Sequence, residues 1–299
     1  MNLPSEPTLC VLSSSSGGNC SVLTWVENTY RRSIFIDCGL SPGRTRKLLR
    51  LIGLKQLMPD AVILTHLDED HWHPNWPNFL PKTTAIHIHR NHRARASRAG
   101  VLRHRTLLFE DVFEPLAGLS AESLLVPHDD LGSAAFRFTV AGKRLGYATD
   151  LGRASNDLVG FMKGVGTLAI ESNYCPRMQE SAPRPRSLKD RVMNGSGHLS
   201  NGECARFCES VGPVDHVVLL HLSRQCNRPE LAMEGHRDRA YHLTVAHWRE
   251  PTGFIPIGPG AISRPWFHEN LFVNLSRTHI PESSALSDTP PGSSLSSSR

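Results

Sequence analysis

The chain has 299 residues, of which 39% are hydrophobic and 20% are charged, and its formal net charge is +5. This balance is typical of a globular protein, and no apolar run reaches the roughly 18 residues that a membrane-spanning helix needs. The N-terminus lacks the basic and apolar segments of a signal peptide, and the seven cysteines are an odd, scattered set. We therefore expect a cytoplasmic protein without a disulfide scaffold and without membrane contact. The positive charge favours a polyanionic partner.

The first part of the chain predicts short strands around one helix. Segments rich in β-forming residues at 9–12, 22–26 and 33–37 are separated by polar turns, and 61–64 (Ala-Val-Ile-Leu) has the pattern of a buried strand. Residues 43–52 have the periodicity of a short amphipathic helix.

Strands and helices alternate in the rest of the chain. Strands are predicted at 84–88, 106–109, 123–127, 134–140, 144–148, 166–170 and 216–220. Helices are predicted at 91–99, 155–162, 187–194, 201–210 and 228–243. The order predicts an α/β protein in which two mixed β-sheets pack together with helices outside, an αββα sandwich.

The composition changes near the C-terminus. Residues 283–299 contain eight serines, together with Pro290, Pro291 and Gly292. Such a segment buries too little apolar surface to offset the entropy of ordering it. We expect one folded domain over 1–270 and a disordered tail rich in serine and proline over 276–299.

The densest group of ionisable side chains follows the strand predicted at 61–64. His66, Asp68, Asp70 and His71 lie within six positions of one loop. Imidazole and carboxylate groups together suit divalent Zn, Mn or Fe. A solvated acidic loop would contain the same residue types, but two imidazoles and two carboxylates beside an apolar strand favour metal ligation.

Three single residues repeat this pattern farther along the chain. His128, Asp150 and His221 each follow a predicted strand, and loops at strand ends often carry function. A lone histidine is more often an ordinary core or surface residue. The recurrence at strand ends favours one shared centre.

These motifs resemble the metallo-β-lactamase superfamily, whose pattern is His-x-His-x-Asp-His, then a single His, a bridging Asp and a last His. The resemblance implies the αββα fold and two divalent metal ions (Zn, Mn or Fe). It implies that His66, Asp68 and His128 hold the first ion, that Asp70, His71 and His221 hold the second, and that Asp150 bridges both. Asp37 matches an early aspartate of the family that supports the metal loop.

The chain departs from the family pattern at Asp68, where a histidine is usual. An oxygen ligand adds negative charge to the first site and should shift its preference from Zn toward Mn or Fe. A carboxylate at this place is also seen in the flavodiiron branch, whose flavodoxin module has no counterpart here. A weak first site in a one-metal enzyme remains an alternative, and Glu69 should point away from Asp68.

Four short polar motifs resemble one bacterial group, the YycJ/WalJ-type metallohydrolases. They are Ser15-Ser-Gly-Gly-Asn-Cys20, Glu171-Ser-Asn-Tyr174, Gly197-His-Leu-Ser-Asn201 and Leu220-His-Leu-Ser223. Members of that group are described as 5′-to-3′ exonucleases on double-stranded DNA. The resemblance therefore implies a phosphodiesterase or nuclease that uses a metal-activated water.

Under this hypothesis Asp70 and His198 are the expected catalytic residues. His198 has the chemistry to bind a phosphate oxygen or to protonate the leaving group, although it also fits a structural role near the start of a helix capped by Ser200 or Asn201. Asn173 and Asn201 are expected to line the substrate cleft, with a turn as the alternative for Asn173.

Basic segments provide the remaining evidence on substrate. Residues 90–105 contain six arginines and no acid, and 184–191 add four basic residues. Arg90, Arg93 and Arg95 are the expected phosphate contacts, with a solvated helix face as the alternative. Without interleaved aromatic residues, contact with the nucleic-acid backbone is expected rather than base reading.

Two other functions remain open at this level. The same metal core would serve a hydrolase of small-molecule esters, lactones or thioesters, which would need an apolar pocket and would not need residues 90–105. Asp68 also motivates a non-catalytic protein that binds metal or nucleic acid through a degenerate site. The sequence favours nucleic acid as substrate and identifies no protein partner.

Overall fold

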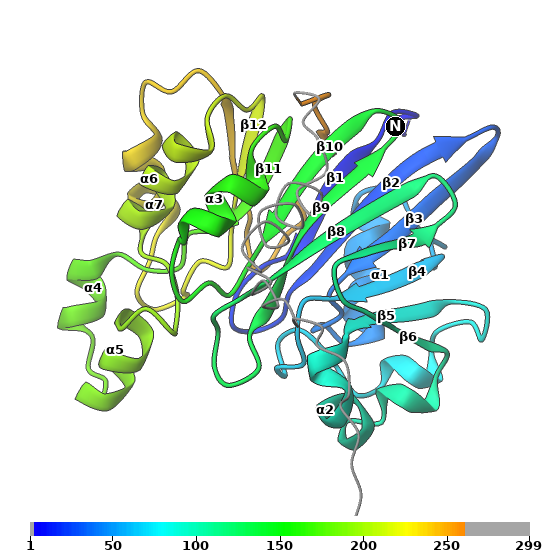
Figure 1. Ribbon diagram of the computed structural model, residues 1–299, viewed down its shortest axis with the longest axis horizontal. Coiled ribbons are helices and arrows are strands. Elements are labelled where there is room, and N and C mark those ends of the chain that lie inside the picture. The colour runs from blue at the N-terminus through cyan, green and yellow to red at the C-terminus, as the bar shows by residue number, and fades with distance from the viewer. Residues whose placement is uncertain (1–2, 261–299) are drawn as a thin grey trace, which may run out of the picture. The chain divides into compact units, whose positions relative to one another are not determined.

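The computed structural model describes residues 3–260, which form two seven-stranded β-sheets with helices outside them (Figure 1). The first sheet has the order β14-β1-β2-β3-β4-β5-β6. Its strands are β1 (Thr8–Ser13), β2 (Cys20–Glu27), β3 (Tyr30–Ile36), β4 (Ala61–Leu64), β5 (Ala85–His89), β6 (Thr106–Phe109) and β14 (Ile255–Pro256).

The second sheet has the order β13-β12-β11-β10-β9-β8-β7. Its strands are β7 (Val112–Leu116), β8 (Leu119–Val126), β9 (Ser133–Val140), β10 (Lys143–Ala148), β11 (Thr167–Glu171), β12 (His216–Leu220) and β13 (His242–Val245). Strands β10 to β13 pair in parallel, as do β3 to β6. The carboxyl ends of each parallel set therefore meet at one edge of its sheet.

Strand periodicity divides the apolar residues between two cores. Leu9 and Val11 of β1 pack in the core between the sheets, together with Phe136 and Phe138 of β9. The residues that alternate with them on the first sheet, such as Leu12, pack in an outer core under the helices. Successive side chains of a strand point to opposite faces, so these continuous apolar runs bury both faces of the first sheet.

Helices cover the outer faces of the sheets. They are α1 (Pro42–Leu51), α2 (Arg93–Arg98), α3 (Asn156–Met162), α4 (Pro176–Ser181), α5 (Arg186–Met193), α6 (Asn201–Val211) and α7 (Pro229–Met233), with the 3-10 turns η1 (Trp76–Asn78), η2 (Arg90–His92), η3 (Val101–Arg103) and η4 (Glu234–His236). Helix α6 begins at a capping box in which Ser200 and Glu203 satisfy each other's backbone N–H groups. The predicted αββα sandwich is confirmed.

One predicted helix is wrong. Residues 228–243 form α7, η4 and the start of β13 instead of one helix. Asp238 adopts a left-handed backbone with φ of 62°, which ends helical geometry. The residues from His242 onward then pair in parallel with β12. Sheet pairing thus decides the conformation of a segment whose apolar spacing also fits a helix.

No helix within residues 3–260 combines the length and the apolar character needed to cross a bilayer. All seven cysteines are free thiols. The predicted domain end at 270 and the predicted tail over 276–299 lie outside the described residues.

Candidate metal centre

The candidate site lies where strand ends of both sheets meet. Asp37 directly follows β3, His221 directly follows β12, and Asp150 lies two residues beyond the end of β10. Their φ values are 59°, 55° and 56°, respectively. Residues other than glycine rarely adopt this left-handed conformation, and such strain collects at functional sites. These turns redirect side chains across the ends of the sheets.

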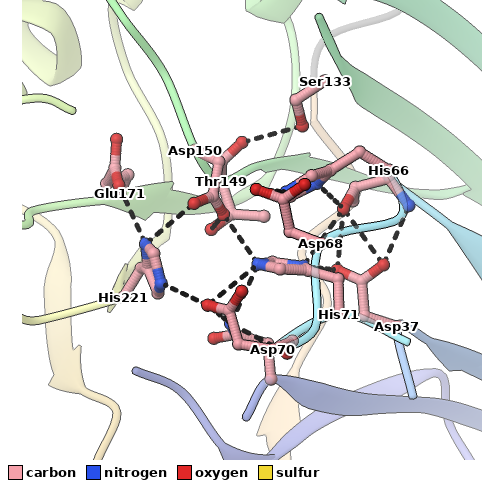
Figure 2. A network of polar contacts seen from close by, with 12 residues as sticks. Asp37, His66, Asp68, Asp70, His71, Ser133, Thr149, Asp150, Glu171 and His221 are labelled. Atoms are coloured by element: carbon pink, nitrogen blue, oxygen red, sulfur yellow. Dashed lines mark hydrogen bonds and ion pairs between the residues drawn. The ribbon is translucent and has the colours of Figure 1, made fainter. Parts of the chain in front are cut away.

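All seven predicted metal ligands converge at this point (Figure 2 labels six of them). Their donor atoms fall into overlapping groups whose members lie within 4.8 Å of one another. The groups are His66–Asp68–His128, His66–His71–Asp150, Asp70–His71–His221 and a fourth in which Asp150 and His221 join Glu171 and His198. The sequence pattern therefore located one cluster of side chains contributed by four separate segments.

The first group is built around Asp68. Its Oδ2 lies 3.7 Å from His66 Nε2 and 3.8 Å from His128 Nε2. The Nε2 atom of His66 is buried and has no hydrogen-bond partner in the described part of the chain. An unsatisfied buried nitrogen is costly, and a cation held between these three side chains would satisfy it.

The second group is more tightly spaced. His221 Nε2 lies 3.2 Å and His71 Nε2 lies 3.6 Å from Asp70 Oδ2. Asp150 reaches both groups, because its Oδ2 is 3.0 Å from His71 Nε2 and its Oδ1 is 3.9 Å from His128 Nε2. The two carboxylate oxygens of Asp150 therefore face one histidine of each group.

The outer ring nitrogens of three histidines are held by hydrogen-bond partners. Asp37 Oδ2 lies 2.8 Å from His71 Nδ1, the Gly197 carbonyl oxygen lies 3.1 Å from His128 Nδ1, and Thr65 Oγ1 lies 3.0 Å from His66 Nδ1. Such contacts fix ring orientation and leave Nε2 facing the centre, as is usual for metal-binding histidines. The supporting role expected for Asp37 fits this position.

The turn between β1 and β2 supports the second group. The Asn19 side-chain amide lies 3.2 Å from Asp70 Oδ2 and 2.9 Å from His71 Nε2, while its backbone N–H donates to the Asp70 carbonyl at 2.7 Å. Gly39 permits this packing, because a Cβ there would lie 1.7 Å from the carbonyl oxygen of Asp70.

Glu171 belongs to one of the four polar motifs, and no role was predicted for it from the sequence. It ends β11 and is fully buried. Its Oε1 lies 2.8 Å from His198 Nδ1 and 3.0 Å from His221 Nδ1, and its Oε2 accepts from the backbone N–H groups of Leu151 and Leu199. Its place at a strand end, like those of Asp150 and His221, was the available signal.

The surrounding carboxylates change the pKa values of the histidines. Burial opposes protonation of His221, but Asp150, Asp70 and Glu171 raise its pKa to about 10. Burial likewise opposes protonation of His128, whereas Asp68 and Asp150 raise its pKa to about 9. The centre therefore attracts positive charge, which protons supply when no metal ion is bound.

Arg95 contacts Asp68, the residue at which the chain departs from the family pattern. Its Nη2 lies 2.7 Å from Asp68 Oδ1, the oxygen opposite the one that faces the histidines. The neighbouring rings of His128 and His66, together with Arg95, hold the pKa of Asp68 far below its ordinary value. The extra negative charge at this position is thus partly balanced by a guanidinium from α2.

The other predicted substrate residues occupy different settings. Arg90 pairs with Glu110 at 2.6 Å on the surface, and Arg93 is exposed on α2. The amide of Asn173 donates to the His221 carbonyl at 2.7 Å, and that of Asn201 lies in a buried network with Ser172 and Asn227. These internal partners favour supporting roles for both asparagines, and their contact with substrate stays a prediction.

Residues 32–222 match a family model described as a β-lactamase superfamily domain. The chain belongs to this superfamily. It is 27% identical over 231 residues to the exodeoxyribonuclease WalJ of Streptococcus pneumoniae serotype 2 (strain D39 / NCTC 7466), covering 74% of this chain and 84% of that protein. It is 25% identical over 229 residues to the exodeoxyribonuclease YycJ of Bacillus anthracis, with the same coverage.

The fold has counterparts among solved structures. The metallo-β-lactamase fold protein YhfI from Bacillus subtilis superposes with a TM-score of 0.63 at 17% identity, covering 83% of this chain and 99% of that one. The sequence prediction of family and fold is confirmed by these matches.

Proposed function

We propose that this chain is a metal-dependent nuclease that hydrolyses phosphodiester bonds of DNA. The observation that carries the proposal is the convergence of four histidines and three aspartates into two donor groups, with Asp150 within 4 Å of a histidine of each. The names of the two relatives support DNA as substrate. Hydrolysis from a 5′ end is the mode that the sequence resemblance implies.

The donor chemistry of these groups fits two divalent ions. In this proposal His66, Asp68 and His128 would hold one ion, Asp70, His71 and His221 would hold the other, and Asp150 would be shared by both. The orphaned Nε2 of His66 and the anchored outer nitrogens of His71 and His128 support inward ligation. When bound, a pair of divalent ions supplies Lewis acidity and lowers the pKa of a water molecule.

His198 is the residue best placed to handle a proton beside the centre. Its side chain is 22% exposed, and its Nδ1 lies 2.8 Å from Oε1 of the fully buried Glu171. A carboxylate on Nδ1 orients an imidazole, so that its Nε2 is the ring nitrogen available to a leaving oxygen. Glu171 acts here as a positioning residue, because it acts through the rings of His198 and His221 that it contacts.

The proposal is tested with purified protein, a 5′-labelled DNA duplex and a chelator. We expect cleavage to cease after chelation and to return when Mn, Fe or Zn is added back. A variant with Asp157→Asn on the exposed surface of α3 is the matched control and should behave as wild type. Cleavage that persists in the chelated protein, or that no metal restores, would contradict the proposal.

A further inference from the structure

A pocket of about 410 Å³ lies beside the second donor group, between the β1–β2 turn and the segments that follow β12 and β13. It is lined by Ser16, Arg184, Ser223, Arg224, Gln225 and Trp248. Two residues of chain span at most about 7 Å. Ser223 is two residues from His221. Ser16 is two residues from Ser14, whose hydroxyl accepts a hydrogen bond from the His221 N–H at 2.8 Å. The pocket therefore adjoins the centre.

The pocket is positively charged. Its lining contains two arginines and no carboxylate. Within residues 3–260 neither guanidinium forms an ion pair: Arg184 donates to the side-chain oxygen of Gln225 at 2.6 Å, and the Cζ of Arg224 lies 4.1 Å from the ring centroid of Trp248. A third arginine, Arg249, lies over the same indole at 4.2 Å.

The side chains around the pocket contact one another, although Arg224 is exposed. The Trp248 carbonyl accepts from Ser13 Oγ at 3.1 Å and from Arg44 Nη2 at 2.6 Å, which holds the backbone at Trp248 beside the end of β1. Stacking on the indole then orients the Arg224 guanidinium. Its Nη1 lies so close to Gly17 that a Cβ there would be 3.0 Å away.

A pocket that adjoins the first donor group through Arg95 differs in its charge balance. It contains Arg95, Arg98 and Arg191, but also Asp129 and Asp130. Arg95 is paired with Asp68, and Arg191 with Asp129 at 2.6 Å. Its arginines are largely neutralised, whereas those beside Trp248 have no acidic partner in the described chain. The pocket at Trp248 is therefore the stronger site for an anion.

We infer that the Trp248 pocket binds a phosphate of the substrate strand next to the phosphodiester held at the metal centre. This inference rests on the proposed function and defines its substrate as a polynucleotide strand rather than an isolated diester. Arginine forks bind phosphate oxygens in two-point contacts. Arg184 and Arg224 supply the forks, and Trp248 holds Arg224 in position.

The test compares two substrates of one chemistry and different length. Bis(p-nitrophenyl) phosphate offers a diester without neighbouring phosphates, and a short oligonucleotide offers both. In the Arg224→Gln variant we expect kcat/KM for the oligonucleotide, relative to that for the small diester, to fall about tenfold through KM. The matched control is Arg206→Gln on the exposed face of α6, which should leave this ratio unchanged.

Binding gives a second readout that does not depend on turnover. In an Asp70→Ala background, the salt dependence of oligonucleotide affinity should lose about one counterion when Arg224→Gln is added. An unchanged ratio and an unchanged salt slope would overturn the Trp248 pocket while leaving the nuclease proposal intact. If wild type cleaves neither substrate, the proposed function fails, and the salt slope still decides the pocket.

Discussion

The two donor groups of the centre differ in how firmly the fold holds them. His71 and His221 of the second group are fully buried, and their neighbours Asp37, Asn19 and Glu171 are buried too. Asp68 of the first group is 26% exposed, and its outer partner is the half-buried Arg95. Each group has two buried histidines and one part-exposed aspartate, since Asp70 is 21% exposed. The groups differ in their outer partners: buried side chains surround the second group, whereas a guanidinium from a surface helix contacts Asp68, where this chain departs from the family pattern.

This difference indicates at which position the substitution of a predicted metal ligand is tolerated. A change at His71 would disturb Asp37, Asn19 and Asp150 together, since all three contact its ring. Asp68 lies at the rim, where a side chain from one surface helix balances the added charge. The predictions below test whether the second group is indeed the less tolerant one.

The largest effect is expected at the second group. His71→Ala or Asp70→Ala should lower DNA cleavage at least about a thousandfold, because metal ions supply several kcal/mol of stabilisation to such reactions. Kinetics of each variant, with circular dichroism to show that the fold is kept, check this. Undiminished turnover in either variant would refute the assignment of this group.

A smaller effect is expected at Asp37, which supports His71 of the second group from its outer side. Asp37→Asn keeps the shape of the side chain but removes the charge that faces His71 Nδ1, so metal affinity should fall about 10- to 100-fold. Calorimetric titration with Mn measures this, and Asp157→Asn is again the surface control. Equal affinities in the two variants would mean that the contact between Asp37 and His71 does not contribute to metal affinity.

At the rim, Asp68→His should move metal preference toward Zn by about tenfold, because a nitrogen donor replaces oxygen. The exchange also leaves Arg95 without its carboxylate beside a divalent ion. Asp68→His combined with Arg95→Ala should therefore bind Zn several-fold more tightly than Asp68→His alone. Identical preferences across Mn, Fe and Zn would count against this account of the first group.

The smallest effect concerns pH, and it separates the centre from histidines elsewhere. Burial lowers the pKa of His87 and His236 to about 4. These groups stabilise the fold above pH 6.5 and lose that contribution as pH falls toward 4. His128 and His221 have raised pKa values, so in the chelated protein their contribution is complete below 6.5 and is lost as pH rises through about 9 to 10.

Urea unfolding of the chelated protein at pH 5, 7 and 9.5 measures both effects. We expect the free energy of unfolding to be greatest near pH 7 and lower on each side. Adding metal should remove the loss on the alkaline side, because the ion replaces the protons. A free energy that rises steadily from pH 5 to 9.5 without metal would contradict the charge assignment.

Much of the centre was predictable because its residues follow strands. An apolar run that stops at an ionisable residue marks a strand end, and parallel strands bring such ends together, as at Asp150 and His221. Residues whose role depends on three-dimensional contacts were not predictable in the same way. Arg95 is one of six arginines in its segment, and spacing alone does not say which one reaches Asp68.

The fold shows the same limit. Strands with strong apolar runs were located well. Residues 242 and 243 were instead placed at the end of a helix, since only pairing with β12 makes them part of a strand. Strand β7 has an exposed face and a proline, Pro115, and its signal in the sequence is correspondingly weak.

The most direct test of the central claim is the number of divalent ions that the chain binds. Elemental analysis of the protein after loading with Mn or Zn and removal of free metal should give two ions per chain. Asp150→Ala, which removes the proposed bridging carboxylate, should lower this number and abolish DNA cleavage. Wild type that binds no ion, or an Asp150→Ala variant with full metal content and full cleavage, would contradict the account.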